Sequence, residues 1–147
     1  MNTSLAREIA EKVPWVLTEL DLVVTEDYYD PERFGNSVAT LASAQILVRF
    51  VKDRGLVSTW LASPKVPDEW WLLDQILEVV CRKPIEMTDV SLEESAAVVR
   101  ERFTDLTKAL GVDYAHTRDE IVKYAPQRLT RALRYAREKR LTLEKED

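Results

Sequence analysis

The single histidine and the single cysteine are the side chains of this 147-residue chain best suited to catalysis. His116 has no cysteine, serine or acidic residue at a catalytic motif spacing, whereas a general base needs a partner within hydrogen-bond reach. Cys81 flanks an apolar helical stripe, which is typical of a buried structural thiol rather than a nucleophile. One histidine and one cysteine cannot form a His/Cys zinc site, and the three glycines match no common phosphate loop. We therefore expect no catalytic residue among them.

Carboxylates and aromatic rings are concentrated in one short segment: Glu26, Asp27, Tyr28, Tyr29, Asp30, Glu32 and Phe34. Carboxylate oxygens attract hard cations, so an enzyme using the acids near Asp27 and Asp30, with or without a metal, is one hypothesis. The segment lacks the Asp-x-Asp-x-Asp-Gly pattern of a calcium loop, and we expect no resident metal or other cofactor. Acidic and aromatic side chains together also favour recognition of a basic protein.

Trp71 occupies an unusual position on its expected helix. A helix over residues 68–82 would gather its apolar residues on one side and place Trp71 nearly opposite. We expect another part of the chain to cover Trp71; the alternative is an anchor for a partner protein, a role in which tryptophan is enriched. Acidic residues also surround Trp71 in the sequence. The candidate protein-binding surface combines this second acidic segment with the first and comprises Tyr28, Tyr29, Asp30, Glu32, Asp68, Glu69, Trp71 and Asp74.

The last predicted helix is basic, although the whole chain carries a net charge of −5. Residues 118–140 carry +5, residues 141–147 carry −2, and residues 1–117 carry −8. An arginine recurs at every third position of this helix: Arg128, Arg131, Arg134 and Arg137. Such a row can bind phosphates, which makes a regulator that binds nucleic acid or an acidic protein the second hypothesis. Because no nucleic-acid-binding motif accompanies the row, a solvated helix face that pairs with the acidic body is the simpler interpretation.

Hydrophobic periodicity indicates the elements that must position these residues. It predicts a helix over about residues 3–12, interrupted at Pro14, and a short strand over 20–25 followed by a loop over 28–36. Branched residues predict three more strands, and Gly55 predicts a tight turn between the last two. These strands span residues 38–42, 45–51 and 56–62. The short turns imply an antiparallel meander.

Three helices are predicted after the strands. The first begins at Pro67 and ends near Pro84. A capping box that begins at Ser91 starts the second, which Gly111 stops. A second capping box, at Thr117, starts the third. The apolar stripe of this last helix, expected to pack in the core, comprises Ile121, Ala125, Leu129, Ala132, Leu133 and Ala136.

Strands followed by helices predict an α+β fold in a single domain over residues 1–147. We expect an N-terminal helix within 1–19, an antiparallel meander of about four strands within 20–62, and three helices within 67–143 packed on the sheet. No apolar run approaches the roughly 18 residues that span a bilayer, and the N-terminus lacks the apolar core of a signal peptide. A cytoplasmic protein without membrane association is therefore expected, and a lone thiol fits a reducing compartment.

Three segments of the first half of the chain form a recognisable pattern. They read Asp30-Pro31-Glu32-x-Phe34-Gly35-Asn36, then Leu47-x-Arg49-Phe50-Val51-x-Asp53-Arg54-Gly55-x-Val57, then Trp70-x-x-Leu73-x-x-Ile76-Leu77. The pattern resembles small uncharacterised bacterial proteins, some of which are similar to immunity proteins of toxin–immunity systems. The resemblance covers about residues 28–80. It implies a cytoplasmic protein that lacks catalytic residues and neutralises a toxin by binding it, with no functional residue carried over.

A non-enzymatic protein-binding protein, immunity-like in its action, is therefore the first hypothesis. The acidic surface would steer it toward a basic partner. A homodimer is an open alternative, because an exposed strand edge and Trp71 would both offer pairing surface. The nucleic-acid-binding regulator and the carboxylate- or metal-dependent enzyme rank second and third.

Overall fold

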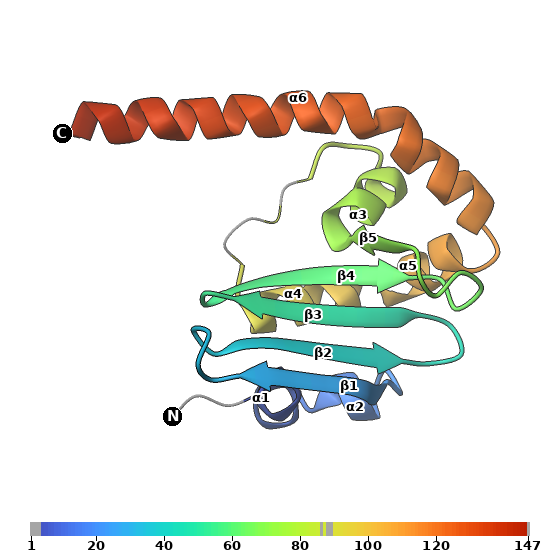
Figure 1. The fold of residues 1–147 in the computed structure, drawn as a ribbon. Coiled ribbons are helices and arrows are strands. Elements are labelled where there is room, and N and C mark those ends of the chain that lie inside the picture. Colours follow the sequence, from blue (N-terminus) through green and yellow to red (C-terminus); the bar gives the residue numbers. More distant parts are fainter. Residues whose placement is uncertain (1–3, 86, 88–89, 147) are drawn as a thin grey trace.

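An antiparallel five-stranded sheet forms the centre of the computed structural model, which describes residues 4–85, 87 and 90–146 (Figure 1). The strands lie side by side in chain order, so each pairs with the next. They are β1 (Val23–Asp30), β2 (Asn36–Ala42), β3 (Leu47–Asp53), β4 (Leu56–Ala62) and β5 (Trp70–Leu72). The predicted α+β class and antiparallel meander are confirmed, and β5 adds a strand to the expected four.

The first three strands differ from their predicted bounds, β2 and β3 by two residues and β1 by more. β1 continues to Asp30, so Tyr28 pairs with Val38 inside a strand instead of lying in a loop. Strand-compatible aromatic residues favour this extension. The predicted turn before β4 is confirmed, because Arg54 and Gly55 have φ angles of 53° and 85°, as a tight hairpin turn requires.

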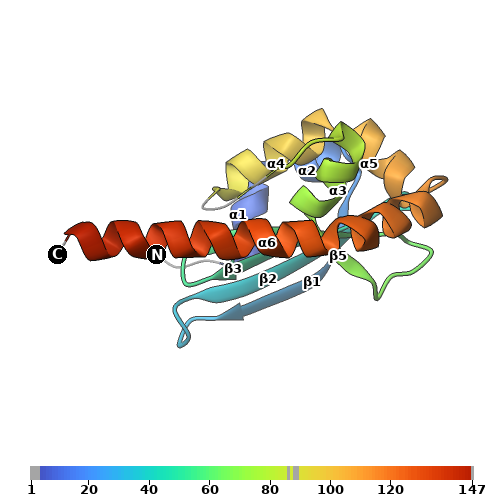
Figure 2. The same cartoon turned by 90° about the horizontal axis from the view of Figure 1, so that it is seen from above.

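Helices cover one face of this sheet (Figure 2). They include α1 (Leu5–Lys12), α2 (Trp15–Thr18), α4 (Leu92–Glu101) and α5 (Phe103–Leu110). The break between α1 and α2 falls at Pro14, as predicted. Buried side chains such as Leu41, Val48, Phe50 and Leu61 alternate along the strands and form the core with these helices. The opposite face of the sheet carries aliphatic as well as polar and aromatic side chains, for example Val51 beside Arg49 and Trp60.

The helix predicted from Pro67 begins instead at Leu73, as α3 (Leu73–Cys81). Residues 70–72 add β5 to the sheet, where Trp71 pairs with Leu61. Bulky aromatic residues fit a strand well, and the Gln75 side chain accepts a hydrogen bond from the Leu72 amide at the helix start. The expected helical position of Trp71 was therefore wrong.

The predicted helix after Ser91 is present but is broken into α4 and α5 at Arg102. The Ser91 hydroxyl accepts a hydrogen bond from the Glu94 amide at 3.1 Å, which confirms the predicted N-cap. Gly111 ends α5, also as predicted. Thr117 does not start the last helix, because α6 (Tyr114–Glu146) begins one turn earlier and Thr117 donates its hydroxyl to the Asp113 carbonyl.

The 33-residue α6 is about 50 Å long at 1.5 Å per residue. It contacts α3 and α5, and its distal part projects beyond the rest of the molecule (Figure 1). Ile121 is buried as expected, but Leu129 and Leu133 are 61% and 63% exposed. The predicted burial of the whole apolar stripe was therefore wrong: α6 meets α3 through a different side, which is polar.

Candidate protein-binding surfaces

The predicted protein-binding surface is not continuous, because its two segments lie at opposite edges of the sheet. Tyr28, Tyr29 and Asp30 belong to β1, whereas Trp71 belongs to β5. Strands β2, β3 and β4 separate these edges. Each half therefore has to be considered as a separate surface.

The half around Trp71 is an internal contact between the sheet and α6. The half-buried Trp71 packs against the core, and its Nε1 donates a hydrogen bond to the Tyr114 hydroxyl at 2.9 Å. That hydroxyl donates to Glu69, whose Oε1 also accepts from Nε of Arg118 at 2.8 Å. Burial, followed by the hydrogen bond to Glu69, raises the pKa of Tyr114 to about 12. The expectation that another part of the chain covers Trp71 agrees with this geometry, while Asp68 lies exposed beside it.

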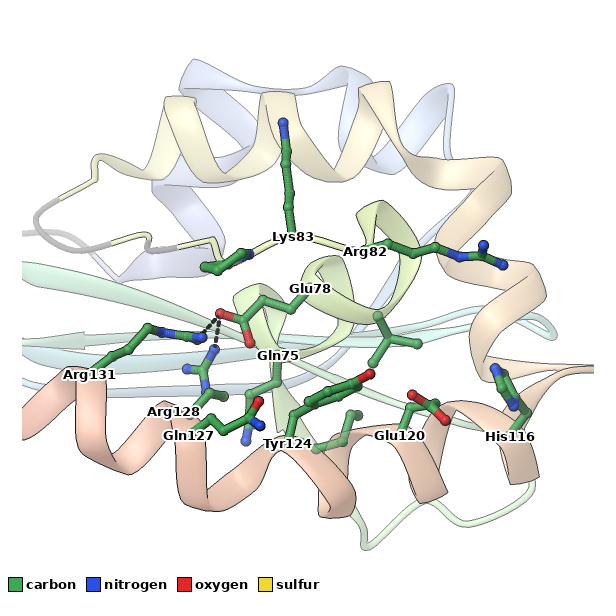
Figure 3. Close-up of a pocket in the computed structure, with 13 residues that line it drawn as sticks. Gln75, Glu78, Arg82, Lys83, His116, Glu120, Tyr124, Gln127, Arg128 and Arg131 are labelled. Atoms are coloured by element: carbon green, nitrogen blue, oxygen red, sulfur yellow. Dashed lines mark hydrogen bonds and ion pairs between the residues drawn. The ribbon is translucent and has the colours of Figure 1, made fainter.

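Two acids on α3 bind two of the predicted phosphate-binding arginines. Figure 3 shows one of these acids, Glu78, with both arginines. Arg128 lies 3.3 Å from Asp74 and 3.1 Å from Glu78, and Arg131 also binds Glu78. The Glu78 side chain is only 11% exposed. Burial lowers the pKa of Arg128, but Asp74 and Glu78 raise it by more, so its pKa is raised overall. This α3–α6 seam is the pairing of basic helix and acidic body that the charge pattern suggested.

Sequence reasoning missed Glu78, the residue that joins both arginines. A signal was present, because Asp74 and Glu78 are four residues apart and so share one face of a helix. Arg128 and Arg131 are three residues apart and share a face in the same way. One helix face with two acids and another with two arginines are complementary in charge, and this complementarity is the signal for a contact between the two helices.

A cleft of about 460 Å³ lies along this seam (Figure 3). His116 lines one end of it, on the first turns of α6 rather than in the predicted loop. Tyr124 and Glu120 also face the cleft from α6, and Arg82 lies at the end of α3. Cys81, the last residue of α3, is partly buried.

The carboxylates of β1 do not converge on a shared site. Glu26 accepts a hydrogen bond from the Thr40 hydroxyl at 2.9 Å, whereas Asp27 lies 3.5 Å from the Ser4 hydroxyl. Neighbouring residues of a strand point to opposite faces, which explains this divergence. Among the residues that the structure describes, no group of three His, Cys, Asp or Glu side chains could hold a metal ion.

The other half of the predicted surface lies at the tips of two adjacent hairpins. Asn36 Oδ1 accepts a hydrogen bond from the Arg54 amide at 2.9 Å, and the Arg54 guanidinium lies 5.2 Å from the Phe34 ring centre. Phe34, Leu56 and Tyr28 are 72%, 58% and 53% exposed. Of the residues predicted here, Glu32 is exposed, Tyr29 is half-buried, and Asp30 binds Arg33. We call Phe34, Arg54 and Leu56 the hairpin-tip patch.

The distal part of α6 exposes a second apolar surface. We call residues 129–141 the arm. At 100° per residue, four of its apolar side chains fall on one side of the helix. These exposed side chains are Leu129, Ala132, Leu133 and Ala136. Val122 and Ala125, both exposed, continue the stripe toward the body.

In the parts of the chain that the structure describes, no helix has the length and apolar composition needed to cross a membrane. No protein-family model matches the chain, and searches of curated proteins and of solved structures returned no match.

Proposed function

We propose that this chain is a non-enzymatic protein-binding domain whose partner docks on the arm. The exposed apolar stripe of the arm carries the proposal. An amphipathic helix gains stability by burying its apolar side, and exposed apolar patches of this kind often mark interaction sites. A helix without such packing is marginal in water at the length of the arm. A partner that covers Leu129 and Leu133 would supply the missing contact.

Neutralising a toxin by direct binding is the form of this function that the immunity-protein resemblance suggests. The resemblance spans about residues 28–80, which contribute most of the sheet and α3. Two of its elements have structural explanations. Phe34 and Gly35 adopt positive φ angles in the β1–β2 turn, and Arg54 and Gly55 do so in the β3–β4 turn. The hairpin-tip patch lies within the same region and offers a second contact for such a partner.

The nucleic-acid alternative depends on the arginine row of α6, and half of that row is already paired. Arg128 and Arg131 bind Asp74 and Glu78, whereas Arg134 and Arg137 are exposed. Phosphate binding through the full row would require breaking the α3–α6 seam. The exposed leucines would also have no role in phosphate contact, which favours a protein partner.

A binding titration against the protein encoded next to this chain tests the proposal. Leu129→Ser/Leu133→Ser should weaken binding at least tenfold, or about 1.4 kcal/mol, because anchors at the centre of an interface dominate affinity. Val23→Ser/Val112→Ser is the matched control, since these valines are 64% and 80% exposed elsewhere. No binding of the wild-type chain overturns the toxin-neutralising form. Binding that the leucine variant does not weaken overturns docking on the arm.

A further inference from the structure

The surface that the arm offers to a partner is positively charged. Residues 129–141 contain five cationic side chains and one acidic side chain. Arg137 and Lys139 are both exposed. At 100° per residue they border the apolar stripe on its two sides. An apolar stripe between cations therefore faces the solvent along the arm.

Three acids of the body bind arginines of α6, and one of these arginines, Arg131, belongs to the first turn of the arm. Glu69 binds Arg118, and Asp74 and Glu78 bind Arg128 and Arg131. Asp74 and Glu78 belong to α3 and Glu69 precedes β5, whereas the distal part of α6 extends away from these elements (Figure 1). The acidic segment around Trp71, expected to attract a basic partner, instead attaches α6 to the body. The arm therefore presents positive charge to a partner, whereas a negatively charged binding surface was expected.

We propose that the partner contributes an acidic amphipathic helix that lies along the arm. The proposal rests on the proposed function and names the chemistry of its partner. Leu129, Ala132, Leu133 and Ala136 follow the three- and four-residue spacing by which paired helices interdigitate. The two alanines leave room for the partner's larger side chains. Carboxylates beside the partner's apolar stripe would face Arg137 and Lys139, giving charge complementarity and steering association.

A second copy of this chain fits the arm less well. A two-fold pair of arms places the same surface on both sides of the interface. Each arm would then set its exposed cations, Arg137 and Lys139 among them, against those of the other. Facing like charges are unfavourable. The charge pattern therefore favours a different, acidic chain.

Fluorescence anisotropy with designed peptides tests this proposal on the full chain. One labelled three-heptad peptide has leucine at positions a and d and glutamate at e and g. A second peptide replaces the glutamates with lysine. We expect the acidic peptide to bind at least about tenfold more tightly than the basic one, with an affinity that falls as salt rises. Equal binding of the two peptides, or no binding of the acidic peptide, overturns the proposal.

Three variants locate the contact. Arg137→Glu/Lys139→Glu should weaken the acidic peptide about tenfold and strengthen the basic one, while Leu129→Ser/Leu133→Ser should abolish binding of both. Arg33→Glu/Lys65→Glu makes the same charge change at exposed positions of the body and should leave both affinities within twofold. Circular dichroism should show unchanged helicity in each variant. If Arg137→Glu/Lys139→Glu binds the acidic peptide as tightly as the wild-type chain does, the proposal is overturned.

A second copy of the chain and a nucleic acid are the other molecules that could bind the arm, and each would give a different experimental result. Sedimentation of a dimer that Leu129→Ser/Leu133→Ser dissociates would assign the arm to a second copy. Binding of duplex DNA that Leu129→Ser/Leu133→Ser leaves unchanged would assign it to nucleic acid. Either result overturns the acidic-helix proposal. The neighbouring gene product could instead bind the wild-type chain and Arg137→Glu/Lys139→Glu equally. That result would overturn the acidic-helix proposal and leave the proposed protein-binding function standing.

Discussion

At the scale of single residues, one hydroxyl links the sheet to the last helix. Tyr114 is buried, accepts a hydrogen bond from Trp71 and donates one to Glu69. Glu69 in turn binds Arg118 on the next turn of α6. Tyr114 therefore fixes the start of α6, and with it the direction in which the arm leaves the body.

Tyr114→Phe should lower the free energy of unfolding by about 1–3 kcal/mol, the usual cost of unpaired buried polar groups. The indole N–H of Trp71 and the carboxylate of Glu69 would both lose a partner. Urea denaturation followed by tryptophan fluorescence measures the effect. Tyr135→Phe is the control, because Tyr135 is 41% exposed and water can hydrate its hydroxyl. An unchanged midpoint for Tyr114→Phe would contradict this role.

The same hydroxyl should make stability depend on alkaline pH. Burial, then the hydrogen bond to Glu69, raises the pKa of Tyr114 from 10.0 to about 12 in the folded chain. The neutral phenol is therefore favoured by folding, and its contribution is complete below pH 10.0 and is lost as the pH rises toward 12. Wild-type stability should fall more steeply over this interval than that of Tyr114→Phe. Urea denaturation at each pH measures both stabilities. If the stability of the wild-type chain and that of Tyr114→Phe fall in parallel, the pH dependence does not come from Tyr114.

At the scale of elements, the contact between α3 and α6 is ionic rather than apolar. Glu78 lies between Arg128 and Arg131 (Figure 3), and Asp74 also binds Arg128. Removing one partner of a sheltered ion pair costs more than removing a surface pair, because the remaining charge is left poorly solvated. The seam should therefore be sensitive to single charge changes.

Glu78→Gln should destabilise the chain by about 1–3 kcal/mol, less than for a fully buried pair because Arg131 is 31% exposed. Two arginines would lose their shared carboxylate. Glu11→Gln is the matched control, since its pair with Arg7 is more than half exposed and such pairs contribute about 0–1 kcal/mol. Hydrogen exchange should also speed up in α6 of the Glu78 variant only. Equal effects of both substitutions would show that the seam contributes no more than a surface pair.

Local patterns determined which elements could be predicted from the sequence. Alternating residues in β2, β3 and β4, the Gly55 turn and the Ser91 cap all depend on near neighbours, and all were predicted, with the bounds of β2 and β3 shifted by two residues. The start of α3 was missed because residues 70–72 fit a helix by spacing but pair with β4 in the fold. Strand pairing is a long-range contact, and the periodicity of one segment does not contain it.

The candidate site was harder to predict, because it depends on which helix faces meet. The stripe through Leu129 and Leu133 was recognised, but a stripe does not reveal what covers it. The acids at Asp74 and Glu69 were recognised as well, although they were assigned to a partner and instead bind α6. Sequence reasoning thus identified most of the residues and assigned several of them to the wrong contact.

At the scale of the whole molecule, the division of charge follows the division between body and arm. The body, residues 1–117, carries −8, and it uses Glu69, Asp74 and Glu78 to hold the first part of the basic helix. Beyond Arg131, the arm keeps Arg134, Arg137, Lys139 and its apolar stripe exposed. Folding therefore depends on the first part of α6, and we expect partner binding to depend on the second.

Removing the arm from Ala132 onward should separate folding from binding. A chain that ends at Arg131 retains Tyr114, Ile121 and both seam arginines, so its melting temperature should stay within about 4 °C of the full chain, a shift equivalent to about 1 kcal/mol or less. It should lose all binding of the acidic peptide. Thermal denaturation and anisotropy measure the two properties on the same sample. A chain that instead ends at Gly111 loses Tyr114 and the seam as well, and should unfold at a much lower temperature. If the chain ending at Arg131 melts as early as that control, the arm stabilises the body and cannot be a free docking surface.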